Sequence, residues 1–293
     1  MKFAAIVREG PAALNEFLKI ETALSDGTEK LRTVSDSPRL DAELLLARAL
    51  DVPRSYLFAH PEDSLDSDAT DRYSSAIERR SGGFPIAYIT GEKEFWSMTL
   101  IVSPDTLVPR PETEVLVDQA LQRIPRDGEF SVLDLGTGSG AIALAIAREY
   151  PNCEITATDV SEAALAVARQ NANQHALPNV EFLSGDWTEP VSGRKFDLIV
   201  SNPPYVPVAD PELAALRYEP RMALAAGDDG LDAIRRISVE AKAVIQDGGT
   251  LIIEHGDRQQ KAVAGILGAD GWTGISHVND LAGQPRVTIV NRG

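Results

Sequence analysis

The sequence predicts an α/β protein in which a parallel sheet flanked by helices follows a small helical region. Three observations carry this prediction. From Phe130 onward, apolar runs of strand length alternate with helical stretches, which is typical of a parallel sheet. A glycine-rich turn, Gly136–Gly140, joins the first of those strands to the first helix. Before about Phe84 the pattern is helical, with leucines at helical spacing.

Length and composition favour two domains in a cytoplasmic protein. The chain has 293 residues, 43% of them hydrophobic, which is long for a single core. No apolar run approaches the ~18 residues that a membrane span needs, so we expect no membrane partner. Cys153 is the single cysteine, which excludes an intramolecular disulfide and a thiolate zinc cluster. The net charge of −16 disfavours a nucleic-acid partner, because such proteins normally present a basic surface.

We expect a helical domain over 1–84 and a β-hairpin linker over 85–108. Ser37 and Pro38 suit the N-cap and first position of a helix that runs to Leu50, and a second helix is expected from 68 to 80. In the linker, two β-prone runs, 87–90 and 95–102, flank a turn at 91–93.

The third region, 109–293, should hold the parallel sheet. An apolar helix is expected to end near Leu121 and a polar stretch after Trp272 to form a hairpin. The other expected strands are 132–135, 155–158, 180–183, 196–201, 250–253 and 286–290, and the other expected helices are 141–150, 161–175 and 231–245.

The glycine-rich turn predicts a nucleoside cofactor. It satisfies the G-x-G-x-x-G/A fingerprint, and Asp159 follows about 20 residues on, where an acidic residue binds ribose hydroxyls. The turn alone does not distinguish a nicotinamide dinucleotide from S-adenosylmethionine. The candidate cofactor residues in it are Gly136, Thr137, Gly138, Ser139 and Gly140.

Asp186 and Trp187 follow the third strand and should lie at the same edge of the sheet. Trp187 could lie against an adenine ring, and Asp186 could accept a hydrogen bond from its amino group. Without the other motifs, a partly buried anchoring tryptophan is an equally good interpretation.

The fourth strand ends in Asn202, Pro203, Pro204 and Tyr205, an unusual sequence for a strand end. Proline has no N–H, so the carbonyl groups there are left without neighbouring donors. The Asn202 side-chain oxygen and the Pro203 carbonyl could accept the two hydrogens of a planar NH2 group, and Pro204 and Tyr205 could clamp its flat face. We interpret these four residues as catalytic and substrate-binding. A methyl acceptor fits such a cradle, whereas hydride transfer has no use for it.

In this order, the motifs resemble those of the seven-stranded Rossmann-like methyltransferases that use S-adenosylmethionine. Within them, nearly the whole chain is similar to the protein-(glutamine-N5) methyltransferase family of bacterial peptide chain release factors, the PrmC/HemK family. The resemblance also rests on 41–46, 91–96, 109–114, 219–224, 229–231 and 254–256. Where the family often has Gly/Asn-Glu-Arg-Val, this chain has Gln284-Pro285-Arg286-Val287, so the role of that loop is open.

The resemblance implies S-adenosyl-L-methionine as cofactor and S-adenosyl-L-homocysteine as product, with Asn202 also near the cofactor. It further implies class-one release factors as partners, with the glutamine of their Gly-Gly-Gln motif as methyl acceptor. The helical domain and 206–230 would hold the release factor, and Phe95, Arg110 and Glu112 would line the pocket.

Three alternatives stay open. The sister enzymes that methylate a glutamine of a large-subunit ribosomal protein share Asn-Pro-Pro-Tyr but usually follow Pro-Arg with Ser-Pro, whereas this chain has 111–114 as Pro-Glu-Thr-Glu. A nucleic-acid adenine-N6 methyltransferase would use the same cradle for its exocyclic amine. A non-catalytic scaffold that binds the cofactor is disfavoured by the intact 202–205 motif.

Overall fold

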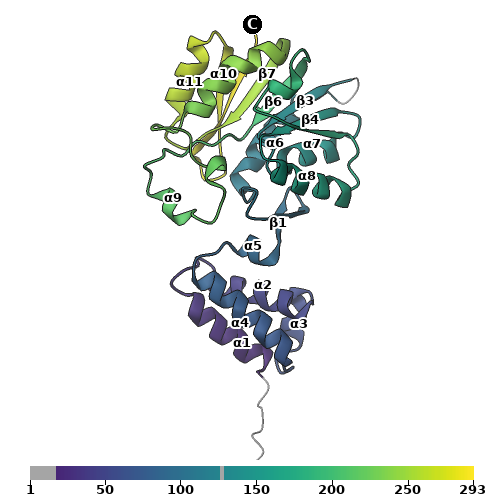
Figure 1. The fold of residues 1–293 in the computed structure, drawn as a ribbon, viewed down its shortest axis with the longest axis vertical. Coiled ribbons are helices and arrows are strands. Elements are labelled where there is room, and N and C mark those ends of the chain that lie inside the picture. Colours follow the sequence, from purple (N-terminus) through teal and green to yellow (C-terminus); the bar gives the residue numbers. More distant parts are fainter. Residues whose placement is uncertain (1–17, 126–128) are drawn as a thin grey trace, which may run out of the picture. The chain divides into compact units, whose positions relative to one another are not determined.

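The structure, a computed structural model, describes residues 18–125 and 129–293 (Figure 1). It divides into two compact units, one ending at Thr90 and the other beginning at Gly91. Residues 1–17, part of the predicted helical domain, lie outside the described residues. Within the described residues, no helix is both long and apolar enough to cross a bilayer.

The first unit is helical, as predicted. Ser37 occupies the N-cap of a helix whose first residue is Pro38. Leucines, alanines and isoleucines from one face of each longer helix form a separate core. The helices are α1 (Ile20–Leu31), α2 (Pro38–Leu50), α3 (Arg54–Ala59), α4 (Ser67–Ser81) and α5 (Ile86–Thr90).

The prediction of a strand over 87–90 is wrong, because α5 covers these residues. Pro85 explains the difference. Its carbonyl accepts hydrogen bonds from the backbone N–H groups of Tyr88 at 3.1 Å and Ile89 at 3.3 Å, which starts a helical turn. Proline at a helix start is common, whereas the β-prone residues that follow give only a weak preference.

The hairpin lies later than predicted, with strands β1 (Glu92–Phe95) and β2 (Met98–Ile101). Its two-residue turn is Trp96-Ser97, with φ of 50° and 54°. Positive φ at both central residues is the mark of the hairpin turns that match strand twist. Phe95 is fully buried in the core of the second unit, together with Met98 and Leu100, so the hairpin packs as part of that unit.

The second unit contains a sheet that, in the described residues, has seven strands in the order β5-β4-β3-β6-β7-β9-β8. Neighbouring pairs from β5 to β7 are parallel, and β9 runs antiparallel to both β7 and β8. The strands are β3 (Ser131–Leu135), β4 (Glu154–Asp159), β5 (Val180–Ser184), β6 (Phe196–Ser201), β7 (Ile245–Glu254), β8 (Thr273–Asn279) and β9 (Pro285–Asn291).

Helices cover both faces of this sheet (Figure 1). Residues of α6 and α7 form one apolar core with the strands, and residues of α10 and α11 form the other. The strands in the middle of the sheet are nearly continuous apolar runs because both faces are covered. The helical elements are η1 (Pro111–Thr113), α6 (Glu114–Leu121), α7 (Ala141–Glu149), α8 (Glu162–Gln174), η2 (Glu189–Val191), α9 (Glu212–Ala215), η3 (Arg221–Ala223), α10 (Asp232–Val244) and α11 (Gln260–Ala269).

Asn171 on α8 joins three parts of the second unit. Its Oδ1 accepts from the backbone N–H of Ile101 at 2.7 Å, and its Nδ2 donates to the carbonyls of Ile101 at 3.0 Å and Ser139 at 2.9 Å. The side chain has 0% exposure. One buried carboxamide therefore connects α8 to the hairpin and to the glycine-rich turn.

We expect Asn171→Ala to lower the free energy of unfolding by about 2–4 kcal/mol, because each buried polar group left unpaired costs ~1–3 kcal/mol. Urea denaturation followed by tryptophan fluorescence measures this, since Trp96, Trp187 and Trp272 all belong to the second unit. Gln174→Ala is the control: its exposed side chain also donates to the hairpin, to the Thr99 carbonyl at 2.8 Å. Equal losses in the two variants would contradict the assignment.

Candidate active site

A cavity of about 460 Å³ lies at the carboxyl ends of the parallel strands. This size is within the range of small-molecule sites. Nine of the predicted site residues line it: Gly136, Thr137, Gly138, Ser139, Asp159, Asp186, Trp187, Asn202 and Pro204. The glycine-rich turn and the end of β6 thus border one cavity.

The other three predicted site residues are not part of the lining of this cavity. Gly140, with φ of 85°, is the N-cap of α7. Pro203 is buried. The Tyr205 hydroxyl donates to Oε1 of the fully buried Glu254 at 3.3 Å.

The glycine-rich turn needs glycine for its backbone shape. Gly136 and Gly138 have φ of 74° and 57°, a region that side chains rarely adopt. A Cβ on Gly136 would lie 3.4 Å from the Trp187 ring, whereas a Cβ on Gly138 would meet nothing within 4 Å. The space beside Gly138 is therefore open to a ligand.

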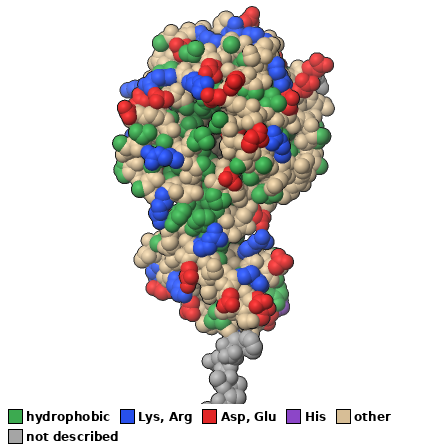
Figure 2. Space-filling model, viewed as in Figure 1, with side chains coloured by type: hydrophobic (Ala, Val, Ile, Leu, Met, Phe, Trp, Pro, Cys, Tyr) green, Lys and Arg blue, Asp and Glu red, His purple; other side chains and the backbone are tan. Residues whose placement is uncertain are grey.

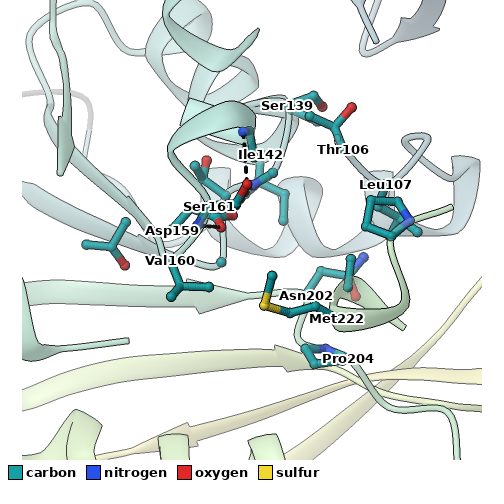
Figure 3. Close-up of a pocket in the computed structure, with 18 of the residues that line it drawn as sticks. Thr106, Leu107, Ser139, Ile142, Asp159, Val160, Ser161, Asn202, Pro204 and Met222 are labelled. Atoms are coloured by element: carbon teal, nitrogen blue, oxygen red, sulfur yellow. Dashed lines mark hydrogen bonds between the residues drawn. The ribbon is translucent and has the colours of Figure 1, made fainter. Parts of the chain in front are cut away.

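Two carboxylates hold the turn in place. Asp159 accepts from the backbone N–H of Gly138 and from that of Ser161, both at 2.9 Å (Figure 3). Burial raises the pKa of Asp159, and these N–H groups oppose that rise. Beneath the turn, Asp134 accepts from the Thr137 hydroxyl at 2.7 Å, and burial raises its pKa to about 7.

The charges around the cavity favour a cationic ligand over a dinucleotide. Its charged lining residues are Asp105, Asp159, Asp186 and Arg110, and Arg110 is paired with Glu219 at 2.5 Å. A pyrophosphate would face three carboxylates, and the Gly138 N–H that it would need already binds Asp159. A positively charged sulfur or ammonium group is attracted by the same carboxylates.

Asp186 and Trp187 line the cavity, and each is held by a contact with another residue. Asp186 is 45% exposed at its side chain and forms an ion pair with Arg236 at 2.6 Å. Trp187 has φ of 48°, and its carbonyl accepts from the Thr158 hydroxyl at 3.0 Å. Their predicted contacts with adenine stay predictions.

Asn202 reaches the cavity from the end of β6 (Figure 3). The preceding residue, Ser201, pairs with Leu135 of β3 and donates to its carbonyl at 2.8 Å. The Asn202 Nδ2 donates to Thr113 Oγ1 at 3.1 Å. Since Nδ2 is engaged by Thr113, the Oδ1 end of the carboxamide is the end available to a ligand.

Two further segments line the cavity, and neither was among the predicted site residues, although 219–224 contributed to the resemblance. Residues 105–107 belong to the lining, where Thr106 lies beside Ser139 of the glycine-rich turn, and Met222 points into the open space from η3 (Figure 3). Arg110 lines the cavity, as the resemblance implied. The matching expectation for Phe95 is wrong, because Phe95 is buried in the core, and Glu112 is exposed and not part of the lining.

Comparison with known proteins identifies the family. The model of the PrmC N-terminal domain matches residues 22–91, and a methyltransferase domain model matches 126–273. The release factor glutamine methyltransferase of Coxiella burnetii is 49% identical, covering 94% of this chain and 100% of its own length. That of Vibrio cholerae is 47% identical, covering 92% and 96%. The chain belongs to the family of release factor glutamine methyltransferases.

Solved structures support the fold. A methyltransferase from Pyrococcus furiosus superposes with a TM-score of 0.52 at 21% identity, over 75% of this chain and 99% of that one. The Thermus thermophilus 16S rRNA N2 G1207 methyltransferase, in complex with AdoMet and guanosine, gives 0.50 at 19% identity, over 69% and 50%. The predicted Rossmann-like, seven-stranded methyltransferase fold is confirmed.

The protein is thus a methyltransferase that uses S-adenosylmethionine, and the cavity fits that cofactor. Its carboxylates suit the positive charges of the cofactor, and Asp159 keeps unused lone pairs for ribose hydroxyls. The turn at Gly138 allows the backbone to approach closely. Which residue contacts which part of the cofactor stays a prediction.

We expect Asp159→Ala to weaken S-adenosylmethionine binding about 10- to 100-fold, because hydrogen bonds to a charged group contribute ~1.5–3 kcal/mol. Isothermal titration calorimetry measures the dissociation constant. Glu162→Ala is the control: it removes the same charge nearby, but Glu162 is exposed and does not line the cavity. An unchanged affinity in Asp159→Ala would refute the assignment.

Proposed function

We propose that this enzyme transfers the methyl group of S-adenosylmethionine to the side-chain amide nitrogen of a glutamine, in the Gly-Gly-Gln motif of class-one peptide chain release factors. The observation that supports it most is the position of Asn202. Its carboxamide lies at the cavity that holds the glycine-rich turn, with its nitrogen bound to Thr113 and its oxygen left for an incoming NH2 group.

The acceptor is held by residues 202–205. The Asn202 Oδ1 and the Pro203 carbonyl accept the two hydrogens of the glutamine amide, which increases the electron density on its nitrogen. Pro204, which lines the cavity, limits the tilt of the flat amide. In place of the predicted contact with the substrate, we now propose that Tyr205 supports this corner from behind, through Glu254.

The transfer needs orientation more than proton removal, because an amide is too weak an acid to lose a proton first. S-adenosylmethionine supplies a methyl group on a cationic sulfur, which leaves as a neutral thioether. The nitrogen lone pair forms the new N–C bond as the C–S bond breaks, and one N–H proton then passes to water. Positioning of this kind can supply ~7–11 kcal/mol of the barrier reduction.

A protein substrate suits the surface better than nucleic acid does. The net charge is −16, and Figure 2 shows basic side chains mixed with acidic ones on this face of the molecule. A nucleic-acid enzyme would be expected to present a continuous basic surface. The curated relatives carry the name release factor glutamine methyltransferase over almost the full chain. We propose that the protein acts in the cytoplasm, where release factors work.

We propose that the first unit and 206–230 recognise the release factor. The family model of the PrmC N-terminal domain covers residues 22–91, which supports a dedicated role for this unit. The domain limits predicted from the sequence are 84 and 108. We propose the functional boundary at Thr90, where one compact unit ends and the next begins along the chain.

Labelled S-adenosylmethionine distinguishes the candidate substrates. The protein is incubated separately with a release factor, a large-subunit ribosomal protein and duplex DNA, and the product is located by mass spectrometry. Methyl transfer to the Gly-Gly-Gln glutamine is the expected result. Transfer to the ribosomal protein alone or to DNA alone would favour the sister enzymes or an adenine methyltransferase, and no transfer at all would favour a scaffold.

We expect Asn202→Ala to lower kcat about 10²- to 10³-fold, the usual effect of removing one group that orients a reacting atom. The dissociation constant for S-adenosylmethionine should change little, because the glycine-rich turn and Asp159 remain. Asn173→Ala, an exposed position on α8, is the control and should keep the wild-type rate. A wild-type kcat in Asn202→Ala would refute the role of this residue.

A further inference from the structure

We propose that Thr113 and Glu254 are positioning residues that determine which end of the Asn202 carboxamide faces the cavity. This inference rests on the proposed function, because it concerns how the acceptor cradle is kept in its working orientation. It arises from three side chains on separate elements: the end of η1, the end of β7 and the residue after β6.

The orientation of Asn202 is a chemical choice, since the two ends of a carboxamide are nearly equal in size. With Oδ1 toward the cavity, the residue accepts from the substrate amide. With Nδ2 toward the cavity, the Asn202 NH2 group would face the NH2 group of the substrate amide, and the two sets of hydrogens would repel each other. In the structure Nδ2 donates to Thr113 Oγ1 at 3.1 Å, which keeps the acceptor end on the cavity side.

Thr113 alone cannot fix this orientation. A hydroxyl has one proton and two lone pairs, so it can accept from Asn202 Nδ2 or donate to Asn202 Oδ1. Thr113 is restricted to the acceptor role toward Asn202 only if its hydroxyl proton is donated to another group. Thr113 is only 4% exposed, although it lines the cavity, so water has little access to that proton.

Glu254 is the group that can take the Thr113 proton. Its side chain has 0% exposure, and the Tyr205 hydroxyl donates to Oε1 at 3.3 Å. Oε2 has no hydrogen-bond partner among the described residues. The Thr113 hydroxyl lowers the pKa of Glu254 by stabilising its ionised form. We propose that Thr113 donates to Oε2, the carboxylate oxygen that the structure leaves unpaired.

We therefore expect the charge state of Glu254 to control the orientation of the Asn202 carboxamide through the Thr113 hydroxyl. When Glu254 is ionised, Thr113 donates to it and accepts from Asn202, and the Asn202 oxygen faces the cavity. When Glu254 is protonated, it can donate to Thr113, whose own proton then turns toward Asn202 and favours the reversed carboxamide. Buried polar networks of this kind are sensitive to each member, because unpaired groups are costly there.

Three charged or titratable groups act on Glu254 from the elements around it: Arg286 on β9, Tyr205 after β6 and Glu112 on η1. Burial has the largest effect and raises the pKa of Glu254 to about 7, while Thr113, Arg286 and Tyr205 lower it and Glu112 raises it. The productive, ionised form is therefore lost as the pH falls through about 7.

Two substitutions of Thr113 test the contact. Thr113→Val keeps the shape but removes the hydroxyl, and we expect kcat to fall at least 10-fold with unchanged affinity for S-adenosylmethionine by calorimetry. Thr113→Ser restores the hydroxyl and should recover most of the rate. A wild-type kcat in Thr113→Val, or equal losses in the two variants, would overturn the proposal.

Glu254→Gln tests the charge. In the wild type, kcat should rise with pH through about 7, and in Glu254→Gln this rise should be lost while kcat stays low. Asp134, whose pKa also lies at about 7, is present in both proteins, so the difference between the profiles belongs to Glu254. An identical rise in both proteins would overturn the proposal.

A spectroscopic readout separates this inference from the proposed function. The Asn202 side-chain ¹⁵N signal is identified by its loss in Asn202→Ala. It should shift with pH around 7 in the wild type and in Thr113→Ser, but not in Glu254→Gln. A signal that does not titrate in the wild type overturns the inference, whatever substrate is methylated, whereas a titrating signal without release factor methylation supports it and counts against the proposed substrate alone.

Discussion

The order of strands in the sheet is the constraint on which the site depends. After β3 the chain builds β4 and β5 outward on one side, and β6 then returns to the other side of β3. The loops after β3 and β6 consequently diverge, and open α/β sheets bind their ligands at such a point. The paired residues Leu135 and Ser201 bring the glycine-rich turn and Asn202 to one cavity. The strand order therefore puts the proposed cofactor loop and the proposed acceptor site at the same cavity.

Buried acidic groups support this edge of the sheet. Glu219 joins two segments, because it accepts from the backbone N–H of Val108 at 3.1 Å and pairs with Arg110. A buried ion pair is weak evidence for stability, since desolvation offsets much of its attraction. Its value here is geometric: it holds 108–110 against the loop that leads to η3, and both border the cavity. Glu254, at the end of β7, is a second buried acidic group, and it accepts from the Tyr205 hydroxyl.

The sequence predicted the sheet well because local and tertiary preferences agree there. The helix predicted over 161–175 is α8, which the Ser161 side chain caps, and the predicted apolar runs form the central strands. The predicted position of the hairpin was wrong for a physical reason. Its turn residues, Trp96 and Ser97, have no intrinsic preference for positive φ. Contacts distant in sequence impose it, since Glu114 Oε1 accepts from the Trp96 N–H at 2.9 Å and Arg148 donates to the Ser97 carbonyl at 2.9 Å.

The same distinction explains which parts of the site were visible in the sequence. A motif shows residues that one stretch of chain brings together, so the turn at Gly136–Gly140 and the 202–205 corner could be recognised. The glycine-rich motif could not distinguish a nicotinamide dinucleotide from S-adenosylmethionine, because both cofactors need the same backbone shape. The distinction between these cofactors depends on the position of the Asp159 carboxylate. In the structure this carboxylate accepts a hydrogen bond from the Gly138 N–H. That N–H is already used by a carboxylate, whose negative charge repels phosphate and attracts a cationic methyl donor.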